Sequence, residues 1–278
     1  MKRLAALFLL LTIALPAAHA ADAKRPFRVG LFPNLTPLTL ITLYQPLRHH
    51  LEDKLHQPVE MMTAPDFRTF VMRTQDGAYD AVLTAPHLAR LAEQDANYVP
   101  VATYGETLQA LLIVPRDSPF KQLADLRGAK IATPDPLALV DMLGREMLDQ
   151  AGLARSDYTL VNAHSHNGAA LAALSGDSQA AIVGSVPYAQ IPEATRRSLR
   201  ILASSRIVPN QVWLVNARLD ADRQRQFVDA LLSFAATADG RAFLKSRGCG
   251  GIRKLRPGEL NALNPFAQEV KKMLGPRG

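Results

Sequence analysis

Short apolar runs alternate with amphipathic segments over most of the chain, and this alternation predicts the fold. Residues 27–31 and 80–84 have the apolar content of buried strands. Between them, apolar residues recur at steps of three and four, as on one face of a helix: Leu40, Leu43, Tyr44, Leu47, Leu51 and Leu55. Strands separated by helices indicate parallel pairing, because parallel neighbours need a crossover connection.

The same alternation starts again in the second half of the chain. Strands are predicted at 111–114, 130–132 and 158–161, with a helix near 139–150. A glycine turn that leads into a short apolar run occurs in both halves, at 77–83 and 176–182. We therefore predict an α/β fold of two lobes, each a mostly parallel sheet flanked by helices, with a ligand cleft between the lobes.

The last part of the chain is mostly helical after residue 220, and those helices need a sheet to cover. The simplest arrangement returns the chain to the first lobe. This return is expected near residues 204–210, which makes the first lobe discontinuous. Two strands near 108–112 and 203–208 would form the hinge.

The N-terminus has the pattern of a secretory signal peptide. Lys2 and Arg3 precede an apolar run from Leu4 to Leu15, and Ala18-His19-Ala20 offers a small-residue cleavage site, so we expect cleavage after Ala20. The apolar run is shorter than the roughly 20 residues of a spanning helix. The mature chain is expected to be a soluble protein of the periplasm.

Composition limits the possible partners. Lys and Arg number 32 against 25 Asp and Glu, but the basic residues are scattered and few aromatic residues lie among them, so no nucleic-acid platform is expected. The single cysteine, Cys249, has no partner for an internal disulfide, and its role stays open. We expect a monomer.

Polar residues that follow predicted strands are the candidates for ligand contact, because ligands of open α/β sheets bind at the carboxyl ends of strands. They are Asn34 and Thr36, Thr84 and His87, and His166 and Asn167. Capping of local turns and helices is the alternative role for each of them.

No catalytic residue, metal or cofactor is expected. The chain has no Gly-x-Ser-x-Gly and no His-Glu-x-x-His motif. His164 and His166 lie close together, but no acidic residue or cysteine near them in sequence completes a zinc site. The prediction is a binding protein rather than an enzyme.

Residues 27–210 resemble the phosphate/phosphite/phosphonate-binding proteins that serve ABC importers. The resemblance rests on six segments in this order: Tyr44–Leu51, Gly77–Pro86, Val114–Ser118, Leu123–Ala132, Asp135-Pro136, and Ser165-His166-Asn167 with Gly176. It implies a permease partner and a type II periplasmic binding fold, with lobe one at 26–107 and 208–278 and lobe two at 108–207. It also implies ligand contacts at Tyr44, at Asp135 and at the helix start that contains Leu137 and Ala138. For Asp135 itself the favoured alternative is a helix N-cap, because its carboxylate would repel an anion.

The sequence departs from the family at that helix start. Family members follow Asp-Pro with a Ser/Thr-rich stretch that holds the phosphonate oxygens, whereas Asp135-Pro136 is followed here by Leu137-Ala138-Leu139-Val140-Asp141. The ligand is therefore expected to be a phosphonate-like or other oxyanion-bearing compound, or else a small organic heterocycle or amine. The partner is expected to be an ABC permease or, alternatively, a two-component receptor kinase.

Overall fold

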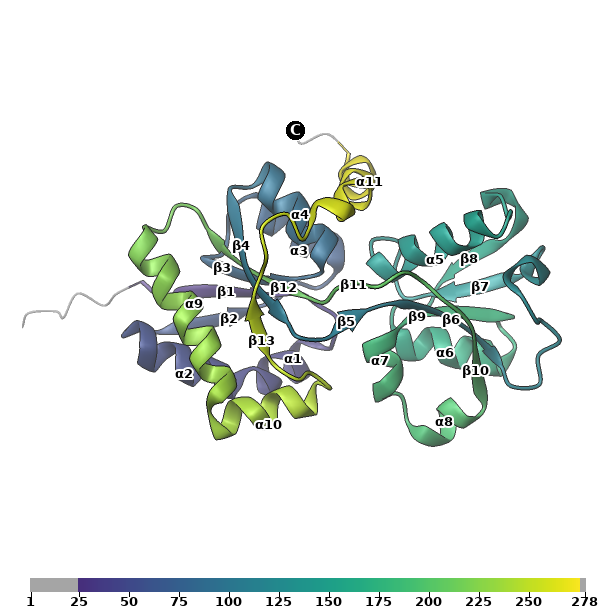
Figure 1. Ribbon diagram of the computed structural model, residues 1–278, viewed down its shortest axis with the longest axis horizontal. Coiled ribbons are helices and arrows are strands. Elements are labelled where there is room, and N and C mark those ends of the chain that lie inside the picture. The colour runs from purple at the N-terminus through teal and green to yellow at the C-terminus, as the bar shows by residue number, and fades with distance from the viewer. Residues whose placement is uncertain (1–24, 276–278) are drawn as a thin grey trace, which may run out of the picture.

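The computed structural model describes residues 25–275, which form two lobes joined by a narrow pair of strands (Figure 1). The expected signal peptide and its cleavage site after Ala20 lie outside the described residues. Within the described part of the chain, every helix is too short or too polar to cross a membrane.

Lobe one contains a six-stranded sheet in the order β13-β4-β12-β3-β1-β2. β1 pairs in parallel with β2 and β3, whereas β12 runs antiparallel to both β3 and β4. The strands are β1 (Phe27–Leu31), β2 (Val59–Met62), β3 (Ala81–Thr84), β4 (Tyr98–Tyr104), β12 (Val212–Asn216) and β13 (Ile252–Lys254). Its helices are α1 (Pro37–Leu43), α2 (Gln45–Leu55), α3 (Phe67–Gln75), α4 (Pro86–Asp95), α9 (Ala221–Ala236), α10 (Ala238–Ser246), the 3-10 turn η3 (Asn261–Leu263) and α11 (Asn264–Leu274).

Both faces of this sheet are covered, and the alternation of side chains along each strand sorts them. In β12, Trp213 and Val215 belong to the core under α2, α9 and α10, while Val212 and Leu214 belong to the core under α4 and α11. Burial on both faces explains why these strands are apolar throughout rather than at every second position.

Lobe two contains a five-stranded sheet in the order β10-β6-β9-β7-β8. Its strands are β6 (Ala110–Pro115), β7 (Lys130–Thr133), β8 (Thr159–Asn162), β9 (Ala180–Gly184) and β10 (Leu199–Ser204). Its helices are α5 (Leu139–Gln150), α6 (His166–Ser175), α7 (Ser185–Gln190) and α8 (Glu193–Arg197), with the 3-10 turns η1 (Leu123–Leu126) and η2 (Arg155–Asp157). Helix α5 packs against β6 and β9, and α6 packs against β7 and β9.

The repeated glycine turn of the sequence corresponds to the same local structure in each lobe. Gly77 and Gly176 both adopt a left-handed conformation, with φ of +69° and +84°. The Arg28 amide then donates to the Asp80 carboxylate at 2.8 Å, and the Lys130 amide donates to the Gln179 side chain at 2.7 Å. These corresponding bonds show that the two lobes share one construction at the entry to β3 and β9.

The connection between the lobes consists of β5 (Thr107–Leu108) and β11 (Val208–Pro209), which pair antiparallel with each other (Figure 1). The predicted two-lobed α/β class is confirmed. The sheets differ from the expectation in being mixed, since β6 and β12 run against the parallel strands of their sheets and β13 pairs antiparallel with β4. β6 and β12 are the strands by which the chain enters each sheet from the connection, so the chain meets each sheet there from the opposite end.

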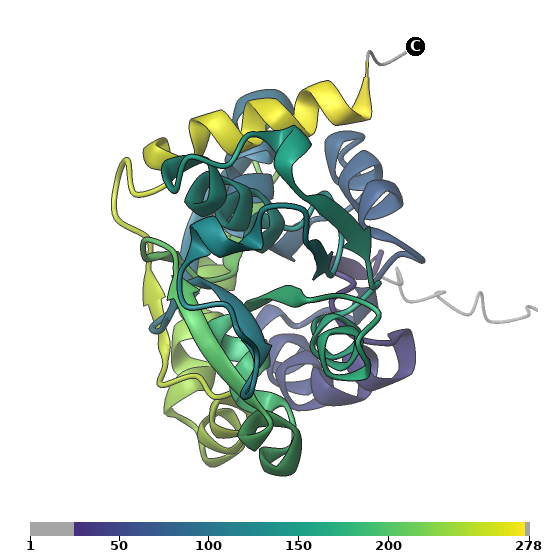
Figure 2. The ribbon, with the colours of Figure 1, turned by 90° about the vertical axis from the view of Figure 1, so that its right-hand side faces the viewer.

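The C-terminal helix also links the lobes. Helix α11 packs on α4 of lobe one and lies along the edge that faces lobe two (Figures 1 and 2). From α11, Glu269 forms an ion pair of 2.6 Å with Arg145 of α5, and the Phe266 ring lies 5.2 Å from the Arg206 guanidinium. One apolar core is continuous from α4 and α11 into α5.

Candidate ligand-binding site

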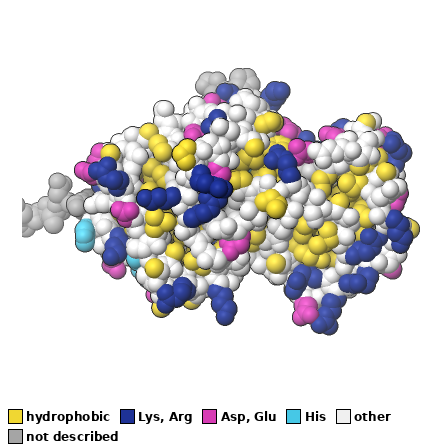
Figure 3. Space-filling model, in the orientation of Figure 1, with side chains coloured by type: hydrophobic (Ala, Val, Ile, Leu, Met, Phe, Trp, Pro, Cys, Tyr) yellow, Lys and Arg dark blue, Asp and Glu magenta, His cyan; other side chains and the backbone are white. Residues whose placement is uncertain are grey.

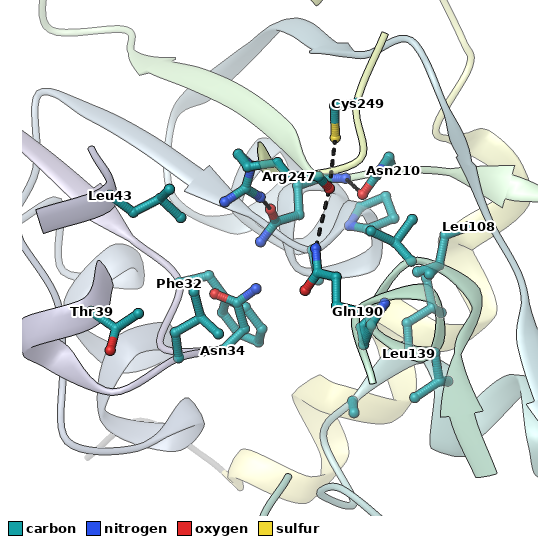
Figure 4. A pocket seen from close by; sticks show the side chains of 18 of the residues that line it. Phe32, Asn34, Thr39, Leu43, Leu108, Leu139, Gln190, Asn210, Arg247 and Cys249 are labelled. Atoms are coloured by element: carbon teal, nitrogen blue, oxygen red, sulfur yellow. Dashed lines mark hydrogen bonds between the residues drawn. The ribbon is translucent and has the colours of Figure 1, made fainter. Parts of the chain in front are cut away.

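A cavity of about 390 Å³ lies between the lobes and is lined by both (Figure 4). This volume is within the range of small-molecule binding sites. Its lining residues are Phe32, Asn34, Leu35, Thr39, Leu43, Ala85, Pro86, Leu108, Ala138, Leu139, Val140, Val186, Pro187, Gln190, Asn210, Gln211, Ser246, Arg247 and Cys249.

Arg247 is the one charged residue among those that line this cavity. It follows α10, where Gly248 turns the chain back in a left-handed conformation with φ of +68° and the Cys249 amide donates to the Leu244 carbonyl at 2.8 Å. This glycine-terminated helix end fixes the backbone at Arg247 and directs the chain towards β13.

The Arg247 guanidinium is held by rings and by one amide. Its central carbon lies 5.2, 5.1 and 5.7 Å from the ring centres of Tyr44, Tyr104 and Phe243, which are cation–π distances. Its Nη2 donates to the Gln211 Oε1 at 2.8 Å. These contacts orient the cation without neutralising it.

No carboxylate of residues 25–275 lies within 4.0 Å of an Arg247 nitrogen. The tyrosine hydroxyls and the thiol beside it are neutral, because burial raises the pKa of Tyr44 and Tyr104 and raises that of the Cys249 thiol to about 11. The Glu106 carboxylate lies beside the Cys249 thiol and accepts from the Gly250 amide. The buried Nε of Arg247 also has no hydrogen-bond partner within the described chain. The cavity therefore contains a positive charge that is not part of an ion pair within the described chain.

The wall from lobe two is mainly apolar. It consists of Leu139 and Val140 at the start of α5, together with Val186 and Pro187 in α7. Ala138 occupies the N-cap of α5 and makes no side-chain capping bond. This wall can bury the organic part of a ligand but offers no hydroxyl group to an oxyanion.

Two carboxylates flank the start of α5. The Leu137 amide donates to Asp135 Oδ1 at 2.7 Å, and Asp141 in the first turn pairs with Arg145 at 2.8 Å. Burial raises the pKa of both carboxyl groups. A carboxylate near a helix N-terminus already interacts with the helix dipole, so this end attracts a further anion less strongly.

Of the ten residues predicted from sequence, Asn34 and Ala138 line the cavity. Leu137 is buried behind the lining, and Thr84 is buried at the end of β3 next to the lining residue Ala85. His87 is buried with its imidazole against the Leu137 carbonyl. Tyr44 lies in the core of lobe one, where its hydroxyl is 3.2 Å from that of Tyr104, so it faces the site only through Arg247.

The remaining four predicted residues also lie outside the cavity lining, and local contacts or exposure explain where their side chains lie. Thr36 caps α1 by accepting from the Thr39 amide, and Asp135 accepts from Leu137. His166 Nδ1 accepts from the Gly184 amide at 3.1 Å, and Asn167 is exposed on α6. Burial lowers the pKa of His166 to about 4, so the imidazole is neutral and offers no charge to an anion.

Sequence reasoning missed Arg247, Gln190 and Gln211, which lie far from the predicted residues along the chain. Gln190 Nε2 in lobe two donates to the Arg247 carbonyl at 3.2 Å, so the two lobes meet directly at this residue (Figure 4). Arg247 precedes a glycine-rich turn that reads as a surface loop. No local pattern distinguishes this arginine from the other basic residues of the chain.

Two lobes, a two-strand connection and a cavity between them define a solute-binding protein of the type II periplasmic class. Residues 29–259 match the family of periplasmic substrate-binding proteins of phosphonate ABC transporters, and the chain belongs to that family.

Solved structures share this fold. XAC2383 from Xanthomonas citri, bound to chloride, is 21% identical, with a TM-score of 0.77 over 89% of this chain and 99% of that one. A binding component of an ABC phosphonate transporter from Pseudomonas aeruginosa is 16% identical, with a TM-score of 0.76 over 91% and 90%. PhnD1 from Prochlorococcus marinus, in complex with methylphosphonate, is 12% identical, with a TM-score of 0.80 over 88% and 98%.

Proposed function

We propose that this protein captures a small oxyanion-bearing ligand in the cavity between its lobes and delivers it to the permease of an ABC importer. The observation that carries the proposal is the cavity lined by both lobes, with the unpaired Arg247 as its single charged residue. Family membership supports the transport role. The proposed lobes are 26–107 with 208–278, and 108–207.

The same proposal includes export and assembly. The chain acts in the periplasm after cleavage behind Ala20, as a monomer and without nucleic acid or cofactor. Lys and Arg side chains are spread over the face shown in Figure 3 rather than gathered into one patch, which supports the exclusion of nucleic acid. Mass spectrometry of the secreted protein should give an N-terminus at Ala21; an N-terminus at Met1 in membrane fractions would contradict export.

The transport role is tested by uptake. Cells that lack this gene should lose uptake of a labelled ligand at low concentration, and the intact gene should restore it. Deletion of the permease gene should cause the same loss of uptake. If uptake is unchanged but a kinase-dependent response to the ligand disappears, the protein serves a sensor instead of an importer.

Ligand binding should also close the lobes about β5 and β11, which are the only two strands of the described chain that join them. Hinge closure is the common response of two-lobed binding proteins. Small-angle scattering should show a smaller radius of gyration at ligand saturation. An unchanged profile would indicate a rigid carrier or an enzyme.

A further inference from the structure

The two walls of the cavity differ in chemistry. Lobe one provides the Arg247 cation together with apolar side chains such as Phe32 and Leu43, whereas lobe two provides mainly apolar side chains from α5 and α7 and no charged group. Arg247 and Leu139 lie on different sides of the pocket in Figure 4. A ligand that satisfies both walls must carry charge at one end and hydrocarbon at the other.

The charge on Arg247 calls for an anion from outside the chain. Burying a cation outside an ion pair is costly, and the aromatic rings and Gln211 relieve only part of that cost. A guanidinium presents several N–H groups in one plane and binds oxyanions with two parallel hydrogen bonds. An amine or other cationic ligand would face repulsion at this point.

The apolar side chains of α5 and α7 are not suited to hold a second anionic group. Leu139, Val140, Val186 and Pro187 offer no donor side chain, and Asp135 and Asp141 flank the start of α5. A bare inorganic anion would also leave this apolar wall in contact with water. An organic body would cover it, at a gain of about 0.8 kcal/mol for each CH₂ group.

Building on the proposed function, we propose that the ligand is an organic monoanion, with its oxyanion head on the Arg247 guanidinium and its hydrocarbon body against the α5 and α7 wall. The proposal thus names the charged pole of the site, on lobe one, and the class of ligand. Asn34, Gln190 and Asn210 lie around the cavity as neutral hydrogen-bonding groups and select for shape rather than charge.

Calorimetry on the unaltered mature protein tests the class of ligand. The probes are linear alkanesulfonates from methane- to hexanesulfonate, because their single charge does not change between pH 4 and 9, with hexanol and hexylamine as neutral and cationic controls. Affinity should rise by up to about fourfold per CH₂ group, equivalent to about 0.8 kcal/mol. Hexanol and hexylamine should bind at least tenfold more weakly than hexanesulfonate.

Three variants locate the charged pole. Arg247→Gln should lower hexanesulfonate affinity by at least tenfold. Lys245→Gln removes an exposed charge from the same helix and should leave it unchanged. Gln211→Glu places a carboxylate on the Arg247 Nη2, and it should also lower the affinity at least tenfold while the melting temperature stays the same or rises. Since this variant keeps the arginine and its surroundings, a loss of binding cannot be ascribed to misfolding.

The outcomes separate this inference from the proposed function. Equal loss of binding in Lys245→Gln and Arg247→Gln, or no loss in Gln211→Glu, would overturn the role of Arg247. Inorganic phosphate that binds more tightly than every sulfonate, with no effect of chain length, would overturn the organic monoanion and leave the importer role intact. Tightest binding of hexylamine would overturn both the anion site and the oxyanion ligand, and absence of binding by every probe at millimolar concentration would overturn the inference alone.

Discussion

The Nε2 atom of His87 lies 3.0 Å from the carbonyl oxygen of Leu137, and this hydrogen bond joins lobe one to lobe two. Because a carbonyl oxygen only accepts, Nε2 carries the hydrogen and Nδ1 is the unprotonated atom. Nδ1 is buried without a hydrogen-bond partner in the described chain. Protonation of the ring would therefore place an uncompensated charge between the lobes.

The first prediction is a loss of stability in mild acid that depends on His87. Burial lowers the pKa of His87 to about 4, against an unfolded value of about 6.5, so the unfolded chain takes up the proton first. The contribution of His87 to the free energy of unfolding is complete above pH 6.5. It falls as the pH drops towards 4, by about 3 kcal/mol in all. Urea unfolding between pH 4 and 8 measures it.

The variant His87→Gln keeps a donor in place of Nε2 but does not titrate. Its free energy of unfolding should fall less than that of the unaltered protein between pH 6.5 and 4. His166→Gln is the matched comparison in lobe two, where burial also lowers the histidine pKa to about 4. Parallel pH curves for His87→Gln and the unaltered protein would show that His87 is not the titrating group.

The second prediction concerns the ion pair between Arg145 and Glu269. It joins α5 of lobe two to α11 of lobe one, and neither side chain is fully buried. Glu269→Gln should therefore weaken the closed form by about 1 kcal/mol, or roughly fivefold in the ratio of closed to open molecules. Scattering without ligand should show a larger radius of gyration, and ligand affinity should fall by a similar factor.

The control is Glu193→Gln, which removes an ion pair with Arg197 inside lobe two. It should change neither the scattering profile nor the affinity. Arg145→Ala is expected to be much more harmful than Glu269→Gln, because it also leaves the buried Asp141 carboxylate without its partner. Equal effects of the two changes would show that Arg145 is not needed to stabilise the buried Asp141 carboxylate.

The third prediction is that Asp80 stabilises lobe one through its charge. Its carboxylate accepts from the Arg28 amide and from the side chains of Arg25 and Arg218 at 2.7 to 2.8 Å. Burial opposes ionisation, but these donors outweigh it and hold the pKa of Asp80 below its usual value. The contribution of the Asp80 charge to the free energy of unfolding is complete at neutral pH, and it is lost as the pH falls through that lowered pKa.

Asp80→Asn should lower the free energy of unfolding by about 2 kcal/mol at pH 7, since hydrogen bonds to charged groups contribute roughly 1.5–3 kcal/mol each and both arginines stay partly hydrated. Asp177→Asn, at an exposed turn of lobe two, is the control and should have little effect. A loss of the same size in both variants would point to a general effect of charge.

The paired positions Asp80 and Gln179 show what the sequence could predict. The two glycine turns with their following strands are local patterns, so the fold class and the repeated lobe construction could be inferred from them. Mixed pairing in the sheets could not, because it depends on where the chain crosses between lobes. Local periodicity contains no information on that crossing.

The site was harder to predict, for a physical reason that Arg247 illustrates. Its environment comes from Tyr44, Tyr104, Gln211 and Phe243, which are up to about two hundred residues apart in sequence. The loop at Asn34 could be found because it directly follows a strand, which is where ligands bind in such sheets. The prediction for His166 rested on the same rule, but its ring bonds to Gly184 instead.

The last prediction is that inorganic phosphate and methylphosphonate bind weakly here, and that hydroxyl side chains introduced at the start of α5 strengthen their binding. The unaltered wall at Leu139 and Val140 offers no donor side chain, and the helix dipole alone provides only about 0.3–1 kcal/mol at exposed sites. The double variant Leu139→Ser with Val140→Thr adds two hydroxyl groups. Each could contribute roughly 1.5–3 kcal/mol to a charged ligand, so phosphate affinity should rise by at least a hundredfold.

The matched control is Leu139→Ala with Val140→Ala, which removes the same apolar groups without adding a donor. Both double variants should weaken hexanesulfonate, because the wall that buries its chain is reduced in each of them. Only the variant Leu139→Ser with Val140→Thr should strengthen phosphate binding, as calorimetric titration can show. Submicromolar phosphate binding by the unaltered protein, unaffected by either double variant, would mean that the anion is held away from α5 by donors such as Asn34, and that the apolar start of this helix does not set the ligand.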